Sequence, residues 1–214
     1  CVLMGRYTHL LFDFDGTLAD SFPFFVTVFN QLAARHRFTA LSPADIDRLR
    51  HLDARTVMRH VGLPMWRLPF VAADFRRLMA KTSQNIHLFD ATDATLRSLH
   101  EAGLQLAVVT SNAPATVHRL LGPERARLIA RVDGGSSIFG KRSRIRRVMR
   151  ELGAAPERTL YVGDQVTDLQ SARRAGVAFG AVGWGYAPLA AFAPHAPEHV
   201  FTDMSDLVHQ VLAA

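Results

Sequence analysis

Two apolar runs in this sequence are each followed by a pair of aspartates. Asp13 and Asp15 stand at the end of the first run, and Asp164 and Asp168 follow the other. Carboxylates gathered in one place repel one another, and a hard divalent cation that prefers oxygen ligands, such as Mg²⁺, relieves the repulsion. The ion also screens a carboxylate from an anionic phosphate, so that the carboxylate can attack phosphorus. The four aspartates are therefore candidate magnesium ligands, and they predict phosphoryl chemistry.

Other polar residues could hold the phosphoryl group. Thr110, Ser111 and Asn112 follow a third apolar run, and Lys141 stands just before a helical segment. The Lys141 ammonium and the Thr110 hydroxyl are suited to stabilising the charge that develops on phosphoryl oxygens. These four residues are the predicted phosphate-binding set.

The spacing of the first two aspartates suggests how the reaction is divided between them. On an extended strand end, the side chains of Asp13 and Asp15 are expected on the same side, two residues apart. With Asp13 as nucleophile, Asp15 is then placed to protonate the leaving oxygen and later to deprotonate water. The predicted catalytic residues are Asp13, Asp15, Thr110 and Lys141.

The elements that must position these residues alternate between strand and helix from residue 88 onward. This alternation is typical of a parallel sheet with helices on both faces, and such sheets bind ligands beyond the carboxyl ends of their strands. The pattern predicts strands at 8–14, 104–109, 159–162, 177–182 and 199–202, and helices at 92–100, 114–121, 143–152, 166–175 and 205–212.

Residues 21–82 have a different pattern. Phe25, Val28 and Leu32 repeat at helical spacing, and no strand is expected between the helices of this segment. The predicted fold class is therefore α/β, with a Rossmann-like parallel sheet core flanked by helices and an inserted all-helical domain. The core is expected to comprise residues 1–20 and 83–214.

The motifs resemble those of the haloacid dehalogenase-like hydrolases. DFDGTLADS at 13–21 is similar to the first motif of that family, and GDQVTD at 163–168 is similar to the fourth. The Thr110 turn and Lys141 are similar to the second and third motifs. Within the family the chain looks most like phosphoglycolate phosphatase-like members. The stretch WGY at 184–186 also resembles those members.

The resemblance implies a role for each aspartate. Asp13 would be both the nucleophile and a magnesium ligand, and Asp15 would bind the ion through its backbone carbonyl while its side chain acts as acid and base. Asp164 would be the third protein ligand. Asp168 would complete the metal site by orienting a metal-bound water or Lys141.

The helical insertion resembles the cap that closes over the site in this family and selects the substrate. Four of its basic residues are candidates for contacting an anionic group: Arg50, His51, Arg55 and Arg59. The predicted activity is magnesium-dependent hydrolysis of a small organic phosphate monoester, with a phosphorylated metabolite as partner. A phosphoglucomutase-like phosphoryl transferase would use the same residues, and a non-catalytic binding protein on the same fold is a further alternative.

The composition and charge indicate which kinds of partner to expect. The chain has 214 residues, of which 49% are hydrophobic, and its formal charge of +6 favours anionic ligands. The basic run 141–150 lacks interleaved aromatic residues and is expected to be a solvated helix face, so nucleic acid is not an expected partner. The sequence has one cysteine, no apolar stretch of ~18–20 residues and no recognisable signal peptide. We therefore expect a cytoplasmic protein that does not bind membranes. It is expected to be a monomer or a homodimer.

Overall fold

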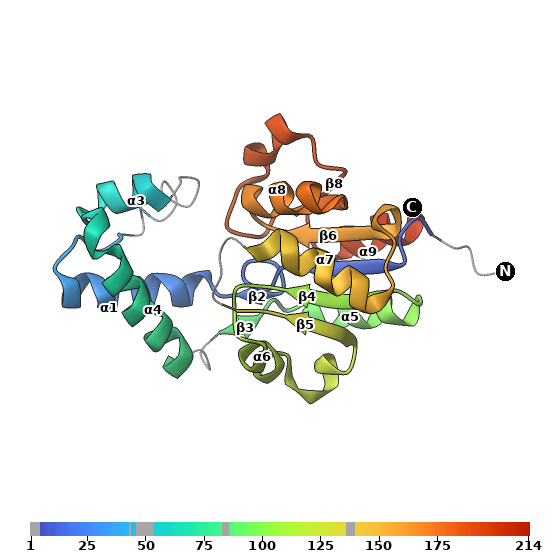
Figure 1. Ribbon diagram of the computed structural model, residues 1–214, viewed down its shortest axis with the longest axis horizontal. Coiled ribbons are helices and arrows are strands. Elements are labelled where there is room, and N and C mark those ends of the chain that lie inside the picture. Colours follow the sequence, from blue (N-terminus) through green and yellow to red (C-terminus); the bar gives the residue numbers. More distant parts are fainter. Residues whose placement is uncertain (1–4, 43, 46–53, 83–85, 136–139) are drawn as a thin grey trace. The chain divides into compact units, whose positions relative to one another are not determined.

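The computed structural model describes residues 5–42, 44–45, 54–82, 86–135 and 140–214. Two compact units make up the chain, called below the sheet unit and the helical unit (Figure 1). Cys1–Asp20 and Leu88–Ala214 form the sheet unit, and Ser21–His87 forms the helical unit. Within the described ranges, no helix is both long enough and apolar enough to cross a bilayer.

The sheet unit is built on six parallel strands in the order β5-β4-β1-β6-β7-β8. The first strand lies in the interior, with β4 on one side and β6 on the other. The chain order reverses at this point, and the carboxyl ends of strands meet there at the position where α/β sheets bind ligands. The strands are β1 (His9–Phe12), β4 (Gln105–Val109), β5 (Ile129–Asp133), β6 (Thr159–Gly163), β7 (Ala178–Val182) and β8 (His199–Phe201).

Helices cover both faces of this sheet, as the fold prediction required. α7 (Lys141–Leu152) and α8 (Val166–Ala175) pack on the face that carries Leu11, Ala107 and Tyr161. The opposite face is covered by α5 (Thr92–Glu101), α6 (Pro114–Ala126) and α9 (Met204–Ala213) (Figure 1). The predicted α/β class with a parallel sheet is confirmed.

One strand, β5, is absent from the sequence prediction. It is an edge strand that pairs with β4, and its second and third residues, Ala130 and Arg131, are exposed. A five-residue edge strand with an exposed centre lacks the continuous apolar run that marks an interior parallel strand. The two-residue strands β2 (Ala19–Asp20) and β3 (His87–Leu88), which pair with each other, were also not predicted.

The described residues of the segment 21–82 form helices and no strand, as predicted for an all-helical insertion, and β2 ends just before this segment. The segment contains α1 (Phe22–His36), α3 (Ala54–His60), the 3₁₀ turn η1 (Met65–Arg67) and α4 (Leu68–Thr82). α1 packs against α4, and the rings of Phe25 and Phe75 meet edge to face with centroids 5.4 Å apart. Beside them Asp74 accepts a hydrogen bond from His36 at 2.9 Å, so apolar and polar contacts both join these helices.

Candidate active site

Asp13 follows β1 directly and lies at the start of a tight turn. Its side chain is buried, and its backbone N–H donates to the Val162 carbonyl oxygen at 2.8 Å, which keeps it beside β6. Gly16 in the same turn has a φ of +73°, and a Cβ there would lie 2.2 Å from Oδ2 of Asp164. Glycine alone combines that backbone conformation with so close an approach. The first and fourth motifs therefore meet at this glycine.

Asp164 follows β6 and is fully buried. Its Oδ2 accepts a hydrogen bond from the Tyr186 N–H at 2.9 Å, whereas Oδ1 has no hydrogen-bond partner among the described residues. A buried carboxylate oxygen without a partner carries a desolvation cost that a bound cation would remove. Asp164 thus offers one oxygen that is held by the protein and one that is available to an ion.

The loop after β7 holds Asp164 in place. Gly185 approaches so closely that a Cβ on it would lie 2.2 Å from the Cβ of Asp164. The Trp184 indole N–H donates to the Thr17 carbonyl oxygen at 2.9 Å, so the loop also contacts the turn after β1. From the sequence, the stretch 184–186 could be singled out only by its resemblance to the family. Its contacts with the site depend on the path of the chain from the end of β7 towards the end of β6, which residue types do not specify.

Lys141, at the first position of α7, joins two of the aspartates. Its ammonium lies 3.1 Å from Oδ2 of Asp13 and donates to Oδ1 of Asp168. The second oxygen of Asp168 accepts from the Gln165 N–H at 3.1 Å, in a capping box at the start of α8. Both oxygens of Asp168 therefore have protein partners, an arrangement that fixes Lys141 beside Asp13.

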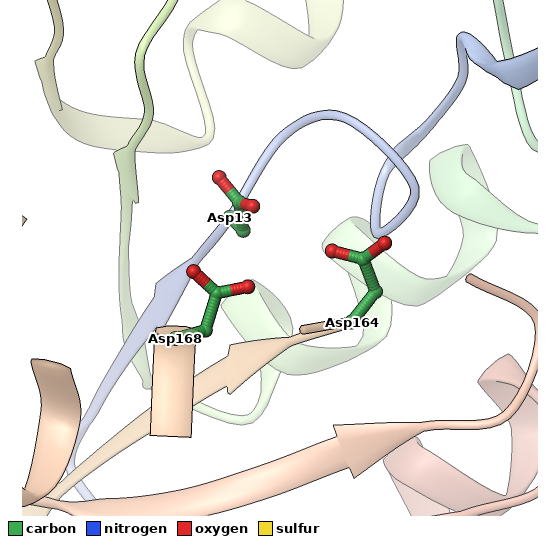
Figure 2. Close-up of side chains that lie close together, drawn as sticks. All are labelled: Asp13, Asp164 and Asp168. Carbon is green, nitrogen blue, oxygen red and sulfur yellow. The ribbon is translucent and has the colours of Figure 1, made fainter. Parts of the chain in front are cut away.

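Asp13, Asp164 and Asp168 lie close together at the ends of β1 and β6 and the start of α8 (Figure 2). One oxygen from each lies within 4.8 Å of the others. Burial raises the pKa of Asp13 to about 7, although Lys141 acts to lower it. Burial, with the neighbouring Asp168 and Asp13, also raises the pKa of Asp164. Crowded carboxylates of this kind, one with a free buried oxygen, fit a hard divalent cation such as magnesium.

The positive charge at the site, on the Lys141 ammonium, is stabilised by its neighbours. Burial alone would lower the pKa of Lys141, but the carboxylates of Asp13 and Asp168 outweigh it and raise the pKa well above the ordinary value. The ammonium also lies over the ring of Tyr161, 5.8 Å from its centroid. Lys141 is therefore a permanent cation within the acidic cluster.

Thr110 directly follows β4, in which Val108 is paired with Phe12 of β1, so Thr110 and Asp13 leave the sheet at the same edge. The Thr110 side chain is buried, and its hydroxyl accepts a hydrogen bond from the Asn112 N–H at 3.1 Å. The turn that the sequence places after this strand thus closes on itself at the carboxyl edge of the sheet.

Asp15 contacts that same turn. Its Oδ2 accepts a hydrogen bond from the Asn112 side-chain amide at 2.6 Å, while Asp13 faces Lys141. An extended backbone was expected through Asp15, but β1 ends at Phe12 and the chain then turns. The turn gives the two carboxylates different partners.

A family model described as haloacid dehalogenase-like hydrolase matches residues 10–182. The chain belongs to this family. A phosphoglycolate phosphatase from Synechococcus elongatus is 29% identical over 203 residues, covering 94% of this chain and 96% of that protein. An N-acetylmuramic acid 6-phosphate phosphatase from Pseudomonas aeruginosa is 28% identical over 193 residues, covering 85% and 84%.

A solved structure described as a predicted phosphoglycolate phosphatase from Haemophilus somnus has the same fold. Its TM-score is 0.78 at 22% identity, with 97% of this chain and 99% of that chain covered. The resemblance drawn from the motifs is therefore confirmed, as is the predicted enzyme class, a phosphatase among the haloacid dehalogenase-like hydrolases.

In this haloacid dehalogenase-like hydrolase, two of the suspected substrate-selecting residues, Arg50 and His51, lie outside the described residues. The side chain of Arg55 is also outside them. Arg59 is exposed in the helical unit, and its guanidinium donates to the Thr56 hydroxyl at 3.4 Å. These four residues stay candidates.

The basic run on α7 departs from its predicted character at one position. Arg142, Arg146, Arg147 and Arg150 are exposed, whereas Arg144 is 9% exposed and belongs to the buried side of the helix. Its spacing from Val148 is four residues, so helical periodicity already placed it on the apolar face. We expected the whole run to form one solvated surface, so the burial of Arg144 was not predicted.

The raised pKa of Asp13 predicts how metal-free protein responds to pH. The folded protein holds this proton up to about pH 7, whereas the unfolded chain releases it near 3.8. Folding stability should therefore fall as pH rises from about 4 through 7, by roughly 3–4 kcal/mol for this group. Urea unfolding in EDTA at pH 5 and pH 8 measures it, with Asp13→Asn as comparison. Equal pH slopes for wild type and variant would contradict the prediction.

Proposed function

We propose that this enzyme is a magnesium-dependent phosphatase that hydrolyses a small organic phosphate monoester through an aspartyl-phosphate on Asp13. The observation that carries the proposal is the buried Asp13 carboxylate, 3.1 Å from the Lys141 ammonium and grouped with Asp164. Burial raises the pKa of Asp13, so this carboxylate needs cationic neighbours to be ionised and reactive at neutral pH. The site supplies one such cation and the ligands for another.

The proposed reaction has two displacements. Asp13 attacks phosphorus, the ester P–O bond breaks, and Asp15 gives its proton to the departing oxygen to release the alcohol. Asp15 then takes a proton from a water molecule that attacks the phosphorus of phospho-Asp13. Inorganic phosphate leaves, and both aspartates return to their starting protonation states. The Asn112 amide at Oδ2 of Asp15 would keep this side chain oriented in both steps.

The phosphoryl oxygens would be held by Lys141 and the turn Thr110, Ser111 and Asn112. Hydrogen-bond donors fixed before the reaction stabilise developing charge without reorganising. Lys141 is fixed by Asp168, and the Thr110 turn is fixed at the end of β4. Both supports are therefore in place in the protein before substrate binds.

The magnesium ion would be held by the carboxylates of Asp13 and Asp164 and by the backbone carbonyl of Asp15, with Asp168 completing the acidic set. Bound there, the ion would neutralise carboxylate charge and withdraw charge from the phosphoryl oxygens. The Oδ1 atom of Asp164, which has no hydrogen-bond partner among the described residues, supports this assignment.

We assign the helical segment 21–82 the role of a cap that excludes water in the first displacement and readmits it for the second. Of the two relatives compared above, one is named for phosphoglycolate and the other for N-acetylmuramic acid 6-phosphate. Relatives that are named for different phosphate esters are in keeping with substrate selection by residues other than those that react. The substrate is then a small phosphorylated metabolite, and phosphoglycolate is the first ester to test.

The test is phosphate release from a panel of esters, including phosphoglycolate, N-acetylmuramic acid 6-phosphate and hexose phosphates, with magnesium and with EDTA. We expect release that requires magnesium and favours one ester. Release that is equal in EDTA would remove the metal assignment. If a well-folded protein released nothing from any ester, a phosphoryl transferase or a binding protein would replace the phosphatase assignment.

A further inference from the structure

Arg144 is a buried charge that the proposed reaction does not use. It lies one turn after Lys141 on α7, among the residues that pack against the sheet. A buried arginine is costly unless it is paired, and Asp133 at the end of β5 pairs with it, with 3.9 Å between Nε and Oδ1. An apolar pair of similar volume would serve packing at least as well. Packing alone therefore does not explain why a charged residue occupies position 144.

The contacts of Arg144 lead to the phosphate-binding turn. Its Nη1 donates to the Thr110 carbonyl oxygen at 2.7 Å, and this hydrogen bond is buried. On the other side of the same residue, the Thr110 N–H donates to the Asp133 carbonyl oxygen at 3.0 Å. The backbone of Thr110 is thus held from α7 and from β5 at once.

A second tether reinforces the first. The Tyr161 hydroxyl donates to the Val109 carbonyl oxygen at 3.0 Å, one residue before Thr110, and the Tyr161 ring lies beneath the Lys141 ammonium. Two consecutive carbonyls at the end of β4 are therefore fixed by side chains that also border Lys141 or share its helix.

We infer that Arg144 is a positioning residue that holds Thr110 at a fixed place relative to Lys141, so that the two act together on one phosphoryl group. The inference rests on the proposed function for the roles of Thr110 and Lys141. Displacement of a binding group by about 1 Å can lower a rate about 100-fold. Of the contacts of Arg144 described above, the hydrogen bond to the Thr110 carbonyl oxygen acts directly on the phosphate-binding turn.

Arg147 provides a matched control. It is on the same helix and also pairs with Asp133, at 3.3 Å, but it is half exposed and makes no hydrogen bond to Thr110 in the described structure. Arg144→Met and Arg147→Met each remove one cationic partner of Asp133. A purely structural role would make both variants lose activity in step with their thermal midpoints.

The experiment measures kcat, KM, the thermal midpoint and the calorimetric affinity for inorganic phosphate with magnesium. For Arg144→Met, at a temperature where it is folded, we expect kcat to fall about 10- to 100-fold and phosphate to bind more weakly. Arg147→Met should keep both close to wild type. Arg144→Lys, which keeps the charge and one donor, should recover part of the loss.

Equal phosphate affinity and kcat in folded Arg144→Met and Arg147→Met would overturn the inference. If Arg144→Met does not fold, the double variant Asp133→Asn/Arg144→Met, which removes the buried carboxylate together with its buried partner, is compared with Asp133→Asn/Arg147→Met, in which Arg144 can still donate to the Thr110 carbonyl oxygen. If the wild-type protein released phosphate from no ester, the proposed function would fail. The phosphate affinities of the same variants would still decide whether Arg144 positions the turn.

Discussion

Asp13→Asn is expected to lower kcat for phosphate release on the order of 10⁴-fold or more while the protein stays folded. Asparagine fills nearly the same space as aspartate, so the buried turn after β1 keeps its packing. The neutral amide cannot attack phosphorus, so no aspartyl-phosphate forms. Because burial disfavours the ionised carboxylate, the variant should also be more stable than wild type at pH 8 in EDTA. Steady-state kinetics and urea unfolding measure the two effects.

Asp93→Asn is the matched control for this substitution. Asp93 lies at the start of α5, is partly exposed and pairs with Arg97 at 2.9 Å and Arg125 at 3.0 Å. We expect turnover at the wild-type rate, because none of these residues belongs to the site. A rate for purified Asp13→Asn within tenfold of this control would show that Asp13 is not the nucleophile.

The acidic cluster could be predicted from the sequence because its positions follow from one rule of sheet architecture. Each aspartate comes just after an apolar run or in the first turn of the next helix, and in parallel strands those places lie at one edge. The sheet brings Asp13, Asp164, Asp168 and Lys141 into contact without any long-range information beyond the order of the strands.

The supports of the site could not be predicted in the same way. Trp184 and Gly185 contact the site because the loop after β7 passes close to it. Asp133 reaches the site because it ends β5, an edge strand with no clear apolar run. Such contacts depend on which backbone groups meet across the sheet, and residue types do not specify that. Arg144 is different, because its helical spacing from Val148 did indicate the buried face.

The choice of lysine at position 141 also has a physical reason. Only two of the 25 basic residues in this chain are lysines. A lysine ammonium is a compact point charge, whereas a guanidinium is a planar fork that spreads its donors over a wider area. Between Asp13 and Asp168, and above the Tyr161 ring, a compact cation can contact both carboxylates from one atom.

Lys141→Met is therefore expected to lower kcat about 100- to 1,000-fold, the usual loss when one fixed donor to a developing oxyanion is removed. A change in the pH dependence of turnover should accompany this loss, because Lys141 also affects the ionisation of Asp13. Lys141 lowers the pKa of Asp13 against the effect of burial, so without Lys141 the pKa of Asp13 should be higher than in the wild type. The acidic limb of the pH–kcat/KM profile should then move to higher pH, because the nucleophile must be ionised to react.

Two variants separate this charge effect from a general disturbance of α7. Lys141→Arg keeps the cation, so the acidic limb should stay near its wild-type position even if the larger guanidinium holds the phosphoryl group poorly and kcat remains low. Arg142→Met changes the next, exposed residue of the same helix turn and should leave the profile unchanged. If Lys141→Met lowered kcat without moving the acidic limb, Lys141 would bind phosphate but would not control the ionisation of Asp13.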